Sequence, residues 1–75
     1  MDHNDAIADE LARQTLAIIE KTGEIALSDE IAGIIGASSS TLEESYLTAV
    51  RVRRAEKRAR DRLKQAALAA GLGKP

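Results

Sequence analysis

Hydrophobic residues recur every three or four positions along most of the chain, and this spacing predicts helices. The apolar or inward positions of the first segment share this spacing and are Ile7, Leu11, Thr15, Ile18 and Ile19. Asp2 or Asn4 can cap its start, and Gly23 after Lys21 can end it in the left-handed conformation. We therefore expect a first helix over about residues 4–22.

The second segment is shorter and follows a polar interruption. Residues 24–27 alternate polar and apolar once, which is typical of a short extended connector. Ser28, followed by two acidic residues, has the pattern of a capped helix start. The apolar face then consists of Ile31, Ile34 and Ile35. We expect a two-turn helix over about residues 29–35, ending at Gly36.

A long helix is predicted for the rest of the chain. Ser40 and Glu43 have the spacing of a capping box, and residues 41–70 contain neither Pro nor Gly. The predicted helix covers about residues 40–70 and leaves a tail over 71–75. Its apolar or small positions step by about 3.5 residues, the period of a helix-packing seam. They are Leu42, Tyr46, Ala49, Val52, Ala55 or a neighbour, Ala59, Leu63, Ala66 and Ala70.

Together these segments predict a single all-α domain over residues 1–75, in which two short helices pack on the first half of a long C-terminal helix. The core is thin, because 14 of the 33 apolar residues are Ala. Small domains of this kind gain stability from disulfides, metals or partner chains. The absence of Cys excludes disulfides, and the single His argues against a metal site, so a partner chain is the remaining source of stability. We therefore expect a homodimer or a heterologous protein partner.

Charge is divided between the two halves of the chain. Residues 1–44 hold ten acidic residues against two basic ones, a net of −8, whereas residues 45–75 hold nine basic against two acidic, a net of +7. The overall charge of −1 therefore hides a dipolar chain. Eight of the basic residues fall within 14 positions of the long helix: Arg51, Arg53, Arg54, Lys57, Arg58, Arg60, Arg62 and Lys64.

This basic run is dense enough to follow a phosphate backbone. No aromatic residue lies within it, which argues against single-strand recognition by base stacking and leaves duplex DNA open. The alternative is a solvated face with ion pairs at four-residue spacing, Glu56 with Arg60 and Lys57 with Asp61. In that case the remaining cations would attract the acidic half of this chain, of a second copy or of another protein.

Residues 28–50 resemble a helix-turn-helix DNA-binding domain. Ala32 lies four residues before Gly36, where two helices would come close, Gly36 allows a sharp turn, and Leu42 and Tyr46 follow at spacings that face the first helix. The resemblance implies that Ser38, Ser39 and Ser40 lie at the start of a recognition helix. The sequence departs from the family in having Glu43 and Glu44 at that end, where phosphates would repel them. A helical hairpin that shares only the turn is the other interpretation.

The sequence offers little material for catalysis. It has no Cys, no second His for a metal site and no Gly-rich phosphate loop, so we expect no enzyme activity, no cofactor and no small-molecule substrate. We expect His3 to lie in an exposed terminal tail. No stretch approaches the roughly 20 apolar residues that cross a bilayer, and the N-terminus lacks the pattern of a signal peptide. These features predict a cytoplasmic protein without a membrane segment.

Two functions remain open from the residues alone. The first is a small nucleic-acid-associated regulatory protein that binds duplex DNA, and the second is a protein-interaction adaptor such as a small chaperone, inhibitor or antitoxin-like partner. For the first, the candidate binding residues are Ser38, Ser39, Ser40, Arg51, Arg53, Arg54, Lys57, Arg58 and Arg60.

Overall fold

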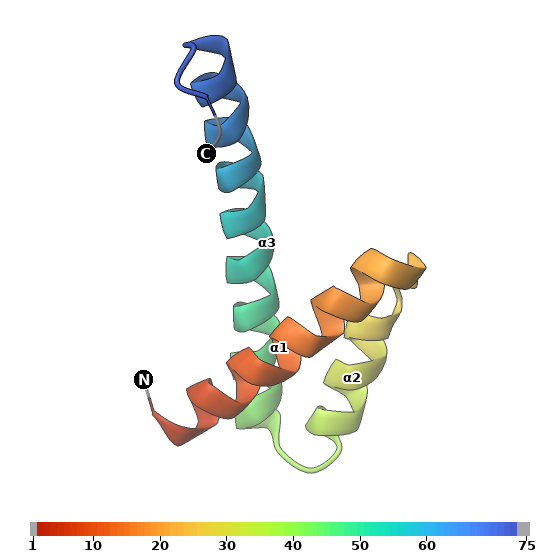
Figure 1. Cartoon of the computed structure of the whole chain (residues 1–75). Helices are drawn as coiled ribbons and strands as arrows, with labels where there is room; N and C mark the ends of the chain where they lie inside the picture. Colours follow the sequence, from red (N-terminus) through yellow and green to blue (C-terminus); the bar gives the residue numbers. More distant parts are fainter. Residues whose placement is uncertain (1, 74–75) are drawn as a thin grey trace.

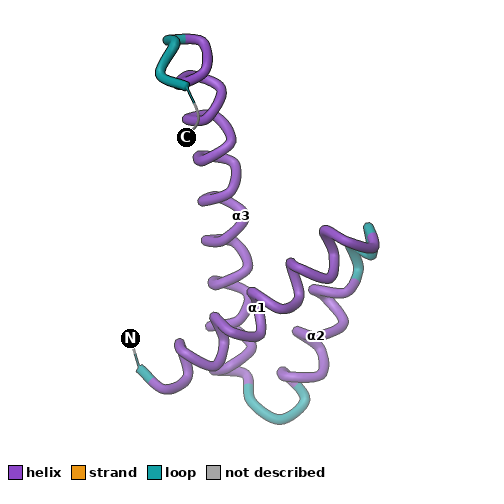
Figure 2. The backbone as a smooth tube through the Cα atoms, in the orientation of Figure 1, coloured by secondary structure: helices purple, strands orange, loops and turns teal. Residues whose placement is uncertain are grey.

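The computed structural model describes residues 2–73, which form three α-helices and no strand (Figures 1 and 2). Helix α1 spans His3–Thr22, α2 spans Leu27–Gly36 and α3 spans Ser40–Ala69. The long α3 packs on the two shorter helices through its first half, and its second half extends away from them (Figure 1). The predicted all-α class with a long C-terminal helix is confirmed; of the predicted tail, residues 74 and 75 lie outside the described residues.

The ends of α1 follow from local chemistry. The Asp2 carboxylate accepts a hydrogen bond of 2.8 Å from the backbone N–H of Asp5, which satisfies one of the free donors of the first turn. At the other end Gly23 adopts φ +74°, and its N–H donates to the carbonyl of Ile19 at 2.7 Å. Both predicted signals are therefore confirmed, whereas His3, expected in a tail, is the first residue of the helix.

The start of α2 differs from the prediction by two residues. Backbone hydrogen bonds from Ile25 to Gly23 and from Leu27 to Glu24 turn the chain directly into the helix, so there is no extended connector. Ala26 is the N-cap residue and supplies no side-chain hydrogen bond. Ser28, expected to be the cap, lies inside the helix and is buried. The turn therefore depends on backbone hydrogen bonds that no capping pattern reveals.

The turn between α2 and α3 covers residues 37–39. Ser39, and not Ser40, caps α3: its Oγ accepts a hydrogen bond of 3.1 Å from the N–H of Leu42. The predicted capping box is wrong for this reason, since Glu43 is then one position too far along the helix. Its carboxylate instead lies against Gly36, where an added Cβ would stand 2.6 Å from Oε1. Gly36 therefore provides room for Glu43, and its φ is not in the left-handed region.

The core consists mostly of small side chains where the three helices meet. The buried residues are Ala8, Ala12, Thr15, Ser28, Ala32, Tyr46 and Val50. Because Ala8, Ala12 and Thr15 follow one another at steps of four and three, they form one face of α1 and let the other helices approach closely. Of the expected face, Thr15 is buried and Leu11 packs against the core, whereas Ile7 and Ile18 are 37% and 48% exposed.

Tyr46 is the largest fully buried side chain of the described residues. Its hydroxyl donates a hydrogen bond of 2.9 Å to Oγ1 of Thr15, and the Thr15 hydroxyl donates to the carbonyl of Leu11 at 2.8 Å. The phenol therefore links α3 to α1 in the middle of the core.

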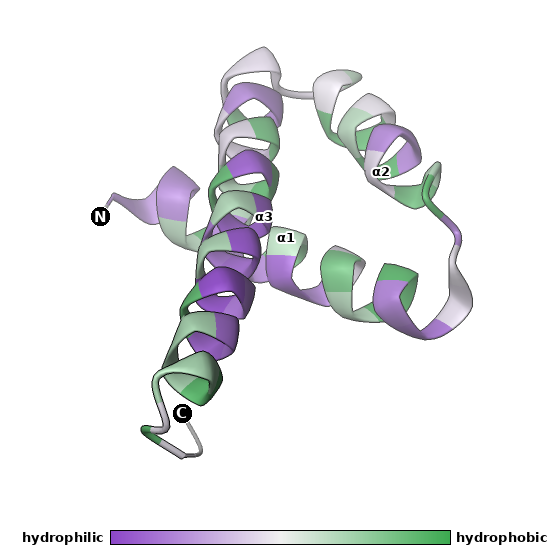
Figure 3. Cartoon of the chain, turned by 90° about the horizontal axis from the view of Figure 1, so that it is seen from above, coloured by the Kyte–Doolittle hydropathy of each residue, from purple (hydrophilic) through white to green (hydrophobic). Residues whose placement is uncertain are grey.

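The apolar seam predicted along α3 contributes to the core only in the first half of the helix. Val50 is buried, whereas Val52, the residue expected there, is 59% exposed. Val50 follows Tyr46 by four residues and lies about 40° from it around the helix, whereas Val52 follows Tyr46 by six residues and lies about 120° away. Beyond Val50 all described residues of α3 are at least partly exposed. Hydrophilic and hydrophobic residues lie on different sides of this projecting half (Figure 3).

Candidate nucleic-acid interface

One cation of the basic run joins α3 to α1. Arg53 donates from Nε and Nη2 to the two carboxylate oxygens of Asp9, at 2.8 and 2.7 Å. This paired geometry matches the fork of the guanidinium to the carboxylate. The hydrogen bonds from Arg53 lower the pKa of Asp9 and raise the pKa of Arg53. Because 44 residues separate the partners, no local spacing in the sequence indicated this pair.

Two further cations pair along α3 itself. Lys57 Nζ lies 3.2 Å from Oδ2 of Asp61, and Arg60 lies 2.9 Å from Oε2 of Glu56. Both pairs have the four-residue spacing expected from the sequence, and both are exposed. These predicted pairs are confirmed. Arg53, Lys57 and Arg60 are therefore cations of the basic run that each have a carboxylate partner within the chain, although the pairs along α3 are exposed.

The remaining arginines form a separate stripe. Arg51, Arg54, Arg58 and Arg62 take part in none of the ion pairs found among residues 2–73. Their steps of three, four and four place them on one face of α3, which we call the arginine stripe. With a rise of 1.5 Å per residue, the stripe is about 16 Å long. Arg62 belongs to this face although it was not among the candidate binding residues.

The three serines lie at the other end of the same helix. Ser39 is occupied as the cap of α3, while Ser38 and Ser40 are exposed. Eleven residues separate Ser40 from Arg51, which corresponds to about 16 Å along the axis. The exposed Glu44 lies in this interval. The structure therefore does not bring the serines together with the arginines into one cluster.

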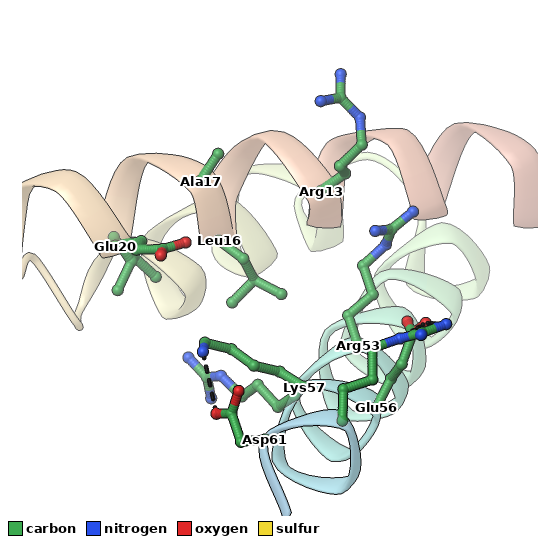
Figure 4. A pocket seen from close by; sticks show the side chains of 11 residues that line it. Arg13, Leu16, Ala17, Glu20, Arg53, Glu56, Lys57 and Asp61 are labelled. Atoms are coloured by element: carbon green, nitrogen blue, oxygen red, sulfur yellow. Dashed lines mark hydrogen bonds and ion pairs between the residues drawn. The ribbon is translucent and has the colours of Figure 1, made fainter. Parts of the chain in front are cut away.

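A groove of about 600 Å³ opens between α1 and the middle of α3 (Figure 4). Leu16, Ala17 and Ile19 of α1 supply its apolar side. Its charged lining residues come from both helices: Arg13, Glu20, Arg53, Arg54, Glu56, Lys57, Arg60 and Asp61. The paired cations thus face the groove, whereas most of the arginine stripe lies on a neighbouring face of α3, since successive residues are about 100° apart around a helix.

The exposed surface of α1 carries another charged network. Glu10 accepts hydrogen bonds from Arg13 and from Nε2 of Gln14. The hydrogen bond from Arg13 is the main reason why the pKa of Glu10 falls to about 2. These contacts stay within α1 and do not reach the basic run.

Among residues 2–73 no group of three His, Cys, Asp or Glu side chains is arranged to hold a metal ion. No helix in this part of the chain is both long and apolar enough to span a bilayer. Comparison of the chain with protein-family models, with curated proteins and with solved structures finds no significant match.

Proposed function

We propose that this chain is a small nucleic-acid-associated regulatory protein that binds duplex DNA through its arginine stripe. The observation that supports the proposal is that seven of the eight residues of the basic run separate into two sets. The eighth, Lys64, has no ion pair among the described residues but lies about 200° around α3 from Arg62, outside the stripe. Arg53, Lys57 and Arg60 are matched by carboxylates of the chain, while Arg51, Arg54, Arg58 and Arg62 have no such partner among the described residues. Four unmatched arginines on one projecting helix form a surface for phosphates.

The side chains of the stripe are suited to phosphate contacts. A guanidinium offers a planar fork of donors that fits phosphate oxygens, so four of them over about 16 Å can contact several phosphates along a backbone. The sole aromatic residue, Tyr46, is fully buried and is not available to stack on an unpaired base. These features favour sequence-independent binding to a duplex.

The serine end of α3 contributes less in this proposal. Ser39 is used as a cap, and the nearby Glu44 would repel phosphates. The helix-turn-helix resemblance of residues 28–50 stays a prediction, and DNA binding by the stripe does not depend on it. A role on DNA agrees with the cytoplasmic location expected from the sequence.

A matched pair of variants tests the proposal. Arg58→Ala with Arg62→Ala removes two charges from the stripe, and Arg13→Ala with Lys21→Ala removes two from α1. Ala is the best helix former, so both variants should keep their helices. In fluorescence-anisotropy titrations of labelled random-sequence duplex DNA, the wild type should bind with a Kd of about 1–100 µM at physiological salt.

The stripe variant should bind several-fold more weakly than the α1 variant. Equal weakening in both variants would mean that only net charge matters and would remove the stripe as the site. No binding of the wild type at low salt would favour the alternative function, a protein-interaction adaptor. That alternative has its own observation, because Ile25 and Ile34 are 72% and 69% exposed beside acidic residues.

A further inference from the structure

The single chain leaves an unusually large surface open. Its radius of gyration is 15.1 Å, whereas a compact chain of 75 residues has about 11 Å. Its accessible surface is 5512 Å², against about 4450 Å² expected for a compact monomer of this mass. The excess of about 1,000 Å² is as large as the roughly 800 Å² that each partner contributes to a stable protein interface.

The open shape is a V whose two arms carry opposite charge. The projecting half of α3 is one arm, and the C-terminal half of α1 with α2 is the other (Figure 1). Residues 51–64 of the first arm hold eight basic and two acidic residues, a net of +6. Residues 24–36, which include α2, hold three acidic residues and no Lys or Arg. None of these three carboxylates takes part in the ion pairs found among residues 2–73.

The acidic arm also exposes aliphatic side chains. Ile25 in the turn and Ile34 on α2 are among the most exposed large apolar residues of the described chain. Glu30 lies four residues before Ile34 and therefore on the same face of α2. Glu24 and Asp29 lie nearby in the sequence. We call this surface the acidic corner; it consists of Glu24, Ile25, Asp29, Glu30 and Ile34.

The groove inside the V has the complementary character. Its apolar side is formed by Leu16, Ala17 and Ile19, and Lys57 reaches across from α3 below Leu16 (Figure 4). A second hollow of about 520 Å³ shares Arg60 and Asp61 with the groove and is also lined by Leu63, Lys64 and Ala67. The groove is lined by five basic residues and by the three acidic residues Glu20, Glu56 and Asp61, a net of +2. An acidic surface with projecting isoleucines would therefore find apolar contacts and an excess of positive charge there.

The acidic corner of one chain is not placed to fill its own groove. The corner lies at the end of α1 and beyond it, whereas the groove runs along the side of α1 between residues 13 and 20. Two α3 arms are also poor partners for each other, because each carries a net charge of +6 over residues 51–64 and like charges across an interface are unfavourable. The occupant that matches both charge and apolar character is the acidic corner of another copy.

We propose that two copies of this chain interlock, each placing its acidic corner in the groove between α1 and α3 of the other. The exchange is mutual, as a two-fold symmetric dimer requires. It covers Ile25 and Ile34 and brings Glu24 and Glu30 to the cations that line the groove. Most of the arginine stripe lies on another face of α3, so the dimer leaves most of the proposed DNA-binding surface accessible.

The mass of the protein in solution, measured by light scattering and sedimentation without DNA, tests the dimer. The wild type should have twice the 8.0 kDa mass of one chain. Ile34→Glu should raise the dimer Kd by at least about tenfold, while Val52→Glu, at an exposed position outside the proposed interface, should leave it unchanged. A monomeric wild type, or a dimer broken by Val52→Glu and kept by Ile34→Glu, would overturn the proposal.

A charge exchange identifies the paired surfaces. Glu24→Lys with Glu30→Lys should give a monomer with unchanged helicity by circular dichroism, and so should Lys57→Glu with Lys64→Glu. An equimolar mixture of these two variants should form a mixed dimer with one wild-type interface and one charge-reversed interface. Failure of the mixture to associate would contradict the proposed pairing, and because no DNA is present, the result is independent of the proposed function.

Discussion

The hydrogen bond between Tyr46 and Thr15 allows a sharp test of how the core is held. The Tyr46 hydroxyl is buried and donates to Oγ1 of Thr15, whose own hydroxyl donates to the Leu11 carbonyl. Thr15→Val leaves the phenol hydroxyl buried without this partner. Tyr46→Phe removes the phenol hydroxyl and leaves Thr15 its bond to Leu11. The two substitutions therefore break the same bond but leave different groups behind.

Their expected effects differ for that reason. A buried polar group left without a partner costs about 1–3 kcal/mol, whereas an intact hydrogen bond contributes about 0.5–1.5 kcal/mol net. Thr15→Val should therefore destabilise by about 1–3 kcal/mol and Tyr46→Phe by about 0.5–1.5 kcal/mol. In the double variant the unpaired hydroxyl is gone, so it should be more stable than Thr15→Val alone. The total stability of a 75-residue domain is only about 4–11 kcal/mol, so these differences are measurable.

Urea unfolding followed by circular dichroism measures all four proteins, at one protein concentration because a dimer would make stability depend on concentration. The expected order of stability is wild type, then Tyr46→Phe, with Thr15→Val lowest and the double variant above it. If Thr15→Val is neutral, or if adding Tyr46→Phe to it lowers stability further, the reasoning about the buried phenol is wrong.

Other predictions concern the turns and the surface of α1. Gly23→Ala should destabilise the protein by about 1–2 kcal/mol, because φ at this position is +74°. Gly36→Ala should be neutral or stabilising, because the flexible carboxylate of Glu43 can move away and Ala favours a helix. Thermal unfolding of both variants compares the two effects. Glu10 has a pKa of about 2 instead of its ordinary 4.5, so the stability that its ionised form provides is present above pH 4.5 and is lost as the pH falls toward 2. The melting temperature of the wild type should therefore fall more than that of Glu10→Gln over this pH range. If the melting temperatures of the two proteins change in parallel with pH, the stabilising role given to the Glu10 pair with Arg13 is wrong.

Local signals in the sequence predicted most of the helix bounds. Asp2, Gly23 and the uninterrupted run of helix formers fixed α1 and α3 to within one residue, because capping and propensity act over a few neighbouring positions. The ion pairs at four-residue spacing, Lys57 with Asp61 and Arg60 with Glu56, were predictable for the same reason. Which serine caps α3 could not be predicted, because three adjacent serines offer the same hydroxyl group.

The packing and the long-range pairs could not be predicted from these signals. Hydrophobicity favoured Ile7 and Ile18 as the core face of α1, but close helix approach selected Ala8 and Ala12. The Arg53 pair with Asp9 depends on how α3 crosses α1 and has no local signature. The division of the basic run into paired cations and an unpaired stripe became visible only with that pair, and the proposed site depends on it.

The salt dependence of DNA binding tests the central claim most directly. If Arg51, Arg54, Arg58 and Arg62 each neutralise one phosphate, the logarithm of the binding constant should fall with the logarithm of salt concentration with a slope of about −3.6 per chain. Replacing all four with Ala should remove nearly all of this slope while the helices remain. A slope that survives this replacement, or the absence of any binding at low salt, would contradict the account.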